Sequence, residues 1–324
     1  MTHAIRIHEY GGPENLLWDE VPTPAPRAGE VLLSHKAIGL NYIDVYFRTG
    51  LYKLPSLPAT IGMEASGLVE AIGDDVTEVA VGDRVAYATG PIGSYAERRI
   101  MKADRLVRLP DALSFEQGAA MMLQGMTAQY LIRRTFKAEA GQTILIHAAA
   151  GGVGLILSQW AKHIGCTVIG TVSTQAKAEL ARQHGVDHAL LVTDDLVARV
   201  KEITNGAMLP VVYDSVGRDT WTNSLDCLAP FGTMVSYGNA SGPVPPFDIG
   251  ILAAKGSLYV TRPTLATYTA KRADLLASAQ DLFDVVSSGV VKIRVNQSWA
   301  LKDAAEAHRA LEARKTTGSS VLLP

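Results

Sequence analysis

The sequence predicts an α/β protein of two domains, one rich in irregular strands and one built on a doubly wound parallel sheet. The chain has 324 residues, and at roughly 100 to 200 residues per domain this length accommodates two cores. In the first hundred residues, short β-prone runs alternate with proline and glycine, which predicts a strand-rich domain. From Thr143 onward strands and helices alternate, a pattern typical of a parallel sheet covered on both faces.

Composition excludes several classes of protein. Hydrophobic residues make up 48% and charged residues 19%, so the chain can bury enough apolar surface to fold. The net charge of −2 provides no basic field that would attract nucleic acid or anionic lipid. The two cysteines, Cys166 and Cys227, exclude a disulfide framework and are typical of reduced thiols. With no secretory signal recognisable in its first residues, the protein is expected in the cytoplasm.

The first domain is predicted from its β-prone runs and from one helix signal. A helix is expected to begin at Ser114, because Ser114 and Gln117 form a Ser-x-x-Gln capping box before an apolar run that ends at Ile132. The expected strands of this domain lie near residues 30–38, 66–72, 83–87 and 96–100.

The second domain is predicted from the alternation itself. Gly141–Ala161 carries no charged residue over about the length that spans a bilayer. Three glycines in its middle instead predict a strand, a turn and a helix. The expected strands lie near residues 143–148, 167–172, 188–192, 210–214, 233–237 and 257–261. Beyond Pro263, a helix is expected near 271–288, a strand near 292–295, a helix near 302–314 and a final strand at 320–323.

The turn after the first of these strands matches a dinucleotide fingerprint. Ala149-Ala150-Gly151-Gly152-Val153-Gly154 follows a predicted strand and opens a predicted helix. Glycines permit a tight turn and a close approach of backbone N–H groups, and the helix N-terminus presents partial positive charge to a pyrophosphate. Ala150, Gly151, Gly152, Val153 and Gly154 are therefore predicted to bind the cofactor.

The position that selects between the two nicotinamide cofactors favours NADPH. NAD-preferring sites usually place Asp or Glu about 20 residues after the glycines, at the end of the second strand. Here Ser173 and Thr174 stand at that distance and Lys177 follows. These hydrogen-bond donors and this cation suit a 2′-phosphate.

These residues and several other blocks resemble the quinone oxidoreductases of the zeta-crystallin branch of the medium-chain dehydrogenase/reductases. The resemblance covers essentially the whole chain. Its most specific element is Gly141-Gln142-x-x-Leu145-x-x-x-Ala149-Ala150-Gly151-Gly152-x-Gly154-x-x-x-x-Gln159-x-x-Lys162. Further matching blocks are Asn41-Tyr42-Ile43-Asp44, Arg48-Thr49-Gly50-Leu51-Tyr52, Gly62-Met63-Glu64, Gly82-Asp83-Arg84-Val85, Val212-Tyr213-Asp214-Ser215-Val216-Gly217 and Thr261-Arg262-Pro263.

The resemblance implies the architecture and the residues of the site. It implies a GroES-like catalytic domain from residues 1–123 and 265–324, an inserted Rossmann domain from 124–264, and an active cleft between them. Asn41, Asp44, Tyr46, Tyr52, Thr127, Gly217 and Gly238-Asn239 would lie on the nicotinamide and substrate side. Ser173, Lys177 and Arg314 would meet the 2′-phosphate. Relatives often have a tyrosine near the position of Val192, so one contact to the 2′-phosphate or its ribose is expected to differ here.

Zinc is not expected, because the ligands of the zinc-dependent members are absent. Those members need a cysteine near the position of Asn41, a histidine after Gly62 and four further cysteines, since Zn²⁺ takes thiolate and imidazole ligands. The chain has Asn41, Met63 and two cysteines in all. Glu64 is accordingly expected to be structural, and His147 to be a packed, hydrogen-bonded imidazole.

The resemblance implies an NADPH-dependent quinone reductase, expected to be a homodimer joined at Ser257–Thr261. Tyr46, Tyr52, Asn41 and Asp44 are the candidate catalytic residues, with the tyrosines open between aromatic packing and contact with the substrate. Two alternatives stay open. One is a reductase of activated C=C bonds in enals or enones, in which a tyrosine would donate a proton. The other is a non-catalytic NADPH-binding protein, crystallin-like or RNA-associated, although the near-neutral charge argues against RNA.

Overall fold

The computed structural model describes all 324 residues and divides them into two compact units. The first unit contains residues 1–126, 268–287 and 293–324, and the second contains 127–267 and 288–292. These boundaries lie a few residues from those expected at 123/124 and 264/265. The segment 288–292 returns to the second unit, which the sequence analysis did not foresee. No helix combines the length and the apolar character needed to cross a membrane.

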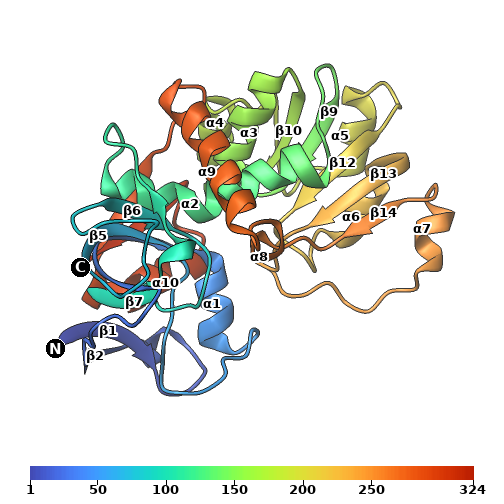
Figure 1. The fold of residues 1–324 in the computed structure, drawn as a ribbon. Coiled ribbons are helices and arrows are strands. Elements are labelled where there is room, and N and C mark those ends of the chain that lie inside the picture. Colours follow the sequence, from blue (N-terminus) through green and yellow to red (C-terminus); the bar gives the residue numbers. More distant parts are fainter. The chain divides into compact units, whose positions relative to one another are not determined.

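The first unit contains two sheets (Figure 1). The smaller sheet has the order β2-β1-β4 and consists of β1 (Thr2–Ile7), β2 (Leu17–Val21) and β4 (Ala59–Thr60). The larger sheet has the order β15-β16-β3-β5-β6-β8, with β7 also paired to β3. Its strands are β3 (Glu30–Leu40), β5 (Ala65–Ile72), β6 (Arg84–Tyr87), β7 (Arg98–Lys102), β8 (Val107–Arg108), β15 (Val295–Ala300) and β16 (Ser319–Leu323).

One helix of the first unit begins at the capping box that the sequence predicts. Helix α2 (Phe115–Tyr130) follows the predicted capping box, in which Ser114 N–H donates to Gln117 Oε1 at 3.0 Å and Gln117 N–H donates to Ser114 Oγ at 3.2 Å. The helix runs past residue 126 into the second unit and continues as a π-helical turn, Leu131–Thr135. The other helices are α1 (Tyr42–Thr49), α9 (Arg272–Ser287) and α10 (Ala304–Glu312).

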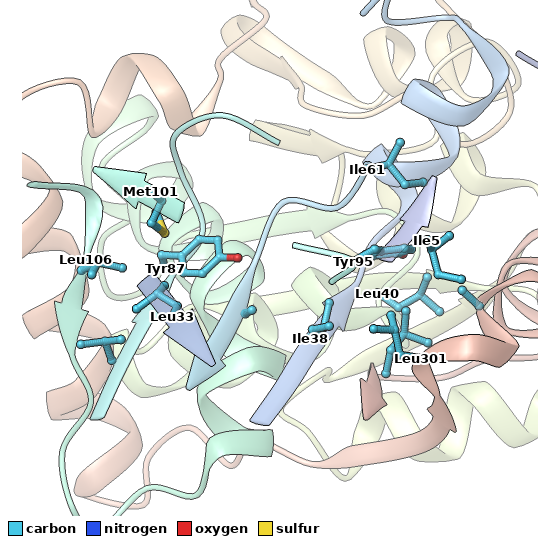
Figure 2. Close-up of a cluster of buried hydrophobic side chains, with 14 of the residues drawn as sticks. Ile5, Leu33, Ile38, Leu40, Ile61, Tyr87, Tyr95, Met101, Leu106 and Leu301 are labelled. Carbon is cyan, nitrogen blue, oxygen red and sulfur yellow. The ribbon is translucent and has the colours of Figure 1, made fainter. Parts of the chain in front are cut away.

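Apolar side chains from both sheets form the core of the first unit. Ile5, Leu33, Ile38 and Leu106 are at most 1% exposed and belong to one cluster. Figure 2 shows these side chains with Tyr95 and others of the cluster. Burial of this apolar surface is the main stabilisation of the unit.

The second unit is the predicted parallel sheet. Its order is β11-β10-β9-β12-β13-β14, and every pairing is parallel. The strands are β9 (Thr143–Ile146), β10 (Thr167–Val172), β11 (His188–Leu191), β12 (Leu209–Asp214), β13 (Leu228–Ser236) and β14 (Tyr259–Thr261). The helices are α3 (Gly152–Ile164), α4 (Gln175–Arg182), α5 (Leu196–Ile203), α6 (Trp221–Asp226), α7 (Gly250–Ala254) and α8 (Leu265–Tyr268), the last at the boundary of the units.

Both faces of this sheet are covered. Leu145 of β9 belongs to the cluster that contains Val200 of α5 and Trp221 of α6. Its neighbours Ile144 and Ile146 point to the opposite face and are also 0% exposed. A strand buried on both faces is typical of a doubly wound fold, so the predicted fold class is confirmed.

The prediction of a strand at 292–295 is wrong. Strand β15 begins at Val295, and the preceding segment is irregular. Lys292 N–H donates to Gln159 Oε1 of helix α3 at 3.0 Å, and Gln159 Nε2 donates to the Lys292 carbonyl at 3.4 Å. A side chain therefore takes the backbone hydrogen bonds that a strand neighbour would otherwise make. Buried Val291 and Ile293 give the segment its strand-like pattern.

Candidate functional site

The parallel sheet reverses its strand order between β9 and β12, which places a ligand site at that point. Strands β10 and β11 lie on one side of β9, and β13 and β14 lie beyond β12 (Figure 1). In open α/β sheets, ligands bind outside the carboxyl ends of the strands where the order reverses. The fingerprint turn follows β9 directly, so the structure brings the predicted motif to this position.

The turn is held so closely that position 154 has no room for a side chain. A Cβ built on Gly154 would lie 2.4 Å from the carbonyl oxygen of Ala148 and 2.8 Å from the carbonyl carbon of Ala149. Ala148 itself has a φ of +51°, and Gly151 N–H donates back to its carbonyl at 2.9 Å. Helix α3 begins at Gly152, and the N–H groups of its first turn have no partner within the helix. They are the donors that a pyrophosphate requires.

Asp214 shapes the second loop at this edge, after β12. Its Oδ1 accepts from Val216 N–H at 2.7 Å and from Gly217 N–H at 3.1 Å. Its Oδ2 accepts from the hydroxyls of Thr220 at 2.6 Å and Ser224 at 2.9 Å. The carboxylate is completely buried, and these four donors satisfy it. The sequence analysis named Asp214 only as part of a matching block and gave it no role. The signal that could have indicated its role in shaping this loop is its position between a buried strand and a glycine turn.

His147 lies beneath the fingerprint turn as a packed imidazole, as predicted. Its Nε2 is 2.9 Å from Ser224 Oγ and its Nδ1 is 2.9 Å from Thr171 Oγ1. Because the Ser224 hydroxyl donates to Asp214, it can accept only from a protonated Nε2, which leaves Nδ1 to accept from Thr171. Burial lowers the pKa of His147, so the neutral ring is favoured.

The loops after β12 and β13 meet closely enough to require glycine in both. A Cβ on Gly217, which has a φ of +93°, would lie 2.6 Å from the Gly242 carbonyl oxygen. A Cβ on Gly238 would lie 2.4 Å from the Ser215 carbonyl oxygen. The predicted residues Gly217, Gly238 and Asn239 therefore lie together.

Ser173, Thr174 and Lys177, which the spacing after the glycines predicts for a 2′-phosphate, stand together after the end of β10. Ser173 and Thr174 are exposed, and Lys177 is half-buried. Thr174 caps helix α4, and its Oγ1 accepts from the Lys177 backbone N–H at 3.3 Å. Val192, where relatives often have tyrosine, is 61% exposed.

The second unit therefore fits a nicotinamide dinucleotide. A Cβ on Gly154 would meet the backbone of Ala148 and Ala149, so this glycine lets helix α3 pack closely on the turn after β9, as the third position of the fingerprint requires. Thr127, at the start of this unit, is buried. Arg314 belongs to the first unit, where it follows helix α10 with a φ of +58°.

The first unit carries the four candidate catalytic residues around helix α1. Asn41 precedes the helix, and its backbone N–H donates to Asp44 Oδ2 at 2.9 Å. The same oxygen accepts from Tyr95 Oη at 3.0 Å. Asp44 is completely buried, and this burial raises its pKa to about 7.

Tyr46 and Tyr52 form an aromatic pair after this cap. Their ring centroids are 5.3 Å apart at an interplanar angle of 68°, an edge-to-face geometry that stabilises such pairs. Tyr52 N–H donates to the Tyr46 carbonyl at 3.0 Å. Tyr46 is buried and Tyr52 is half-buried.

Sequence reasoning missed the partners of Asn41. Glu64, completely buried, accepts from Asn41 Nδ2 at 2.6 Å. Gln124 Nε2 donates to Asn41 Oδ1 at 3.0 Å, and Ser319 Oγ donates to Gln124 Oε1 at 2.7 Å. Glu64 stands in a family block, but no sequence signal links it to residues near 124 and 319.

The donor set does not fit zinc. No group of three or more His, Cys, Asp or Glu side chains is arranged to hold a metal ion. Both cysteines are buried in the second unit, and the amide of Asn41 is engaged by Glu64 and Gln124.

Comparison with known proteins gives full-length matches. Residues 27–111 match the alcohol dehydrogenase GroES-like domain family, and residues 152–277 match the zinc-binding dehydrogenase family. The chain is 54% identical to a quinone oxidoreductase of Pseudomonas aeruginosa, covering 100% of both chains. It is 43% identical to a 2-haloacrylate reductase of Burkholderia sp., covering 100% of this chain and 99% of that one. The crystal structure of Escherichia coli quinone oxidoreductase complexed with NADPH superposes with a TM-score of 0.98 at 48% identity, covering 99% of this chain and 100% of that one.

Proposed function

Because the chain belongs to the quinone oxidoreductase family of the medium-chain dehydrogenases/reductases, we propose that it transfers reducing equivalents from NADPH to a quinone. The observation that carries this proposal is the identity of 54% over the full length of both chains. The relatives carry the names of enzymes, which favours an oxidoreductase over a non-catalytic NADPH-binding protein. The test is the oxidation of NADPH in the presence of quinones, and its absence with every quinone would overturn the proposal.

Bound NADPH supplies the reducing equivalents, and the chain positions it. The N–H groups at the start of α3 would hold the pyrophosphate, because they have no partner within the helix. Gly154 keeps α3 packed on the turn after β9, where a Cβ would meet the backbone of Ala148 and Ala149. Asp214 keeps the neighbouring loop in place through Val216 and Gly217. A quinone is strongly electrophilic and its reduced oxygens can take protons from water, so positioning and electrostatics supply most of the rate.

We assign the choice of NADPH over NADH to Lys177 and Arg314, with Ser173 and Thr174 beside Lys177. A charge-assisted hydrogen bond contributes roughly 1.5 to 3 kcal/mol. Lys177→Ala or Arg314→Ala should therefore weaken NADPH binding by about 10- to 150-fold and leave NADH binding nearly unchanged. Titration of each variant with both cofactors measures this difference. Equal losses for both cofactors would contradict the assignment.

On the substrate side, we assign Tyr46 and Tyr52 to contact with the quinone. A phenol ring can stack on a quinone and its hydroxyl can donate a hydrogen bond. The two rings follow the Asn41–Asp44 cap closely in the sequence. The contacts to the quinone and to the nicotinamide would therefore both come from residues 41–52.

A second candidate function is the reduction of activated C=C bonds. The identity of 43% to a 2-haloacrylate reductase over the full chain supports it, because that relative's name specifies an activated alkene. The reaction needs the same hydride and then a proton on carbon, for which Tyr46 or Tyr52 is the candidate donor.

We propose a homodimer joined through the edge strand β14. Tyr259 and Val260 on this strand are 61% and 36% exposed, and nearby Phe231 is 69% exposed. An unpaired edge strand with exposed apolar side chains can pair with its copy across a two-fold axis.

Charged side chains on this edge should separate the dimer. Tyr259→Lys with Val260→Lys should change the mass in light scattering from twice 34.6 kDa to 34.6 kDa, because like charges would face each other across the axis. Val81→Lys, at an exposed position of the first unit, is the control and should leave the mass unchanged. A wild-type protein that is monomeric at micromolar concentration would contradict the proposal.

We also propose a cytoplasmic location and activity without zinc. Both thiols are free and buried, in agreement with a reducing compartment. The donor set around Asn41 favours a metal-free reaction.

A further inference from the structure

A chain of hydrogen bonds crosses the interior of the first unit and passes through Asn41. Ser319 Oγ donates to Gln124 Oε1 at 2.7 Å, and Gln124 Nε2 donates to Asn41 Oδ1 at 3.0 Å. Asn41 Nδ2 then donates to Glu64 Oε1 at 2.6 Å. All four side chains are at most 7% exposed. Strand β16, helix α2, the cap of helix α1 and the segment before β5 each contribute one member.

In each of these hydrogen bonds the acceptor lies on the side nearer to Glu64, so the donor direction runs from Ser319 to Glu64. The second carboxylate oxygen, Oε2, accepts from the Leu123 backbone N–H at 2.5 Å. An ionised carboxylate can only accept hydrogen bonds, so it fixes Asn41 with its amide nitrogen toward Glu64. This orientation in turn fixes Gln124 with its nitrogen toward Asn41.

The Glu64 side chain lies directly against the backbone of Gly39. A Cβ built on Gly39 of strand β3 would lie 2.3 Å from Glu64 Oε1 and 2.4 Å from the Ala119 carbonyl oxygen. Gly39 N–H also donates to the Glu64 carbonyl at 3.1 Å. The carboxylate is therefore seated against bare backbone, and Asn41 receives a rigid partner.

The hydrogen-bond inventory of Asn41 points to a role for this arrangement. Its amide has two N–H groups and two acceptor sites. The hydrogen bonds to Glu64 and from Gln124 use one N–H and one acceptor site. One N–H remains on a side chain that is 6% exposed. We propose that Glu64 is a positioning residue, which fixes the direction of the Ser319–Gln124–Asn41 chain and thereby presents the remaining N–H of Asn41 to an acceptor on the nicotinamide or the quinone. This proposal rests on the proposed function of the site.

Glu64→Gln tests the direction of the chain while preserving its shape. The side-chain carbonyl of the introduced glutamine can accept from Leu123 N–H, and its amide nitrogen would then face Asn41. Asn41 and Gln124 would both have to turn over, and Ser319 could accept from Gln124 because a hydroxyl both donates and accepts. The same number of hydrogen bonds would run in the opposite direction. A purely structural network would tolerate this reversal.

We expect Glu64→Gln to keep the thermal midpoint close to that of the wild type and to lower kcat/KM with NADPH and a quinone. The expected loss is about 5- to 150-fold, the effect of one misdirected hydrogen bond in a buried site. Wild-type kcat/KM and KM in this variant would overturn the proposal. A loss of activity that is matched by an equal loss of folded protein would also overturn it.

Two neighbouring serines supply the controls. Ser319→Ala removes the first donor but leaves Glu64 to set the direction, so its loss of activity should be smaller than that of Glu64→Gln. Ser320→Ala removes a buried hydroxyl that donates to Gln297 at 3.0 Å, outside the chain, and should leave activity unchanged. A larger loss for Ser320→Ala than for Glu64→Gln would contradict the assignment.

The ionisation of Glu64 provides a readout that a structural role would not move. Burial raises the pKa of Glu64 to about 8. A protonated carboxyl can donate toward Asn41, as the glutamine amide would, so kcat/KM should rise with pH as Glu64 ionises. The titratable groups coupled to Glu64 are Asp44, Tyr87 and Tyr95. Burial raises the pKa of both tyrosines above their usual value of 10, so of these only Asp44 also titrates near neutral pH.

The pH profile of Glu64→Gln should retain the Asp44 step and lack the Glu64 step. A second measurement needs neither cofactor nor activity. In the ¹⁵N NMR spectrum of the free protein, the side-chain amide signal of Asn41, assigned by its loss in Asn41→Asp, should shift as Glu64 titrates. In Glu64→Gln this shift should be absent. An Asn41 signal that does not respond to pH in the wild type would overturn the proposal, whether or not quinones are substrates.

Discussion

Gly154→Ala is expected to abolish useful binding of NADPH and NADH alike. The added Cβ would stand 2.4 Å from the Ala148 carbonyl oxygen, so the turn or the start of helix α3 must move. A shift there would misplace at least two N–H donors to the pyrophosphate, each worth roughly 1.5 to 3 kcal/mol. Affinity for both cofactors should therefore fall by roughly 10²- to 10⁴-fold in a fluorescence titration.

Gly206→Ala is the matched control for Gly154→Ala. Gly206 lies in the same unit with a φ of +84°, and a Cβ there would have nothing within 4 Å. The substitution introduces backbone strain without disturbing the turn, so it should lower the thermal midpoint and leave cofactor affinity unchanged. Near wild-type NADPH affinity in Gly154→Ala would contradict the assigned cofactor turn.

Tyr46→Phe and Tyr52→Phe are expected to separate the two candidate reactions. With a quinone as substrate, both variants should keep most of kcat, because the rings and their edge-to-face packing survive and only a hydroxyl is lost. With an enone as substrate, loss of a tyrosine that delivers the proton should lower kcat by roughly 10²- to 10⁴-fold, the usual contribution of a positioned general acid.

The control for the tyrosine pair is Tyr87→Phe. Tyr87 is buried in the core of the first unit, where its hydroxyl is 3.0 Å from His35 Nε2, so its loss should lower stability without changing kcat. Quinone reduction would be contradicted as the main activity by two results together. The wild type would reduce an enone faster than any quinone, and Tyr46→Phe or Tyr52→Phe would abolish the turnover of that enone.

Local signals in the sequence predicted the second unit well. The alternation of strands and helices gave five of its strands nearly to the residue, because buried strands and capped helices leave short-range patterns. Strand β13 begins at Leu228, several residues before the expected start near 233. The fingerprint around Gly154 predicted the cofactor turn because its constraint is local: the clashing atoms belong to Ala148 and Ala149.

The site of the first unit could be predicted only in part. The resemblance supplied Asn41 and Asp44. Gln124 and Ser319, which belong to the same series of hydrogen bonds as Asn41, lie 83 and 195 residues from their partners in the sequence. Hydrogen bonds over such separations leave no periodic pattern. The error near 292–295 has a related cause, because Gln159 bonds the Lys292 backbone across 133 residues.

The comparison of kcat/KM for quinones and for enals tests the central claim most directly. It requires the purified protein, NADPH, 1,4-benzoquinone and 1,2-naphthoquinone on one side, and simple enals and enones on the other, with the loss of NADPH absorbance as the signal. Quinone reduction predicts a higher kcat/KM for both quinones than for every enal and enone. Lower values for the quinones than for simple enals would contradict it.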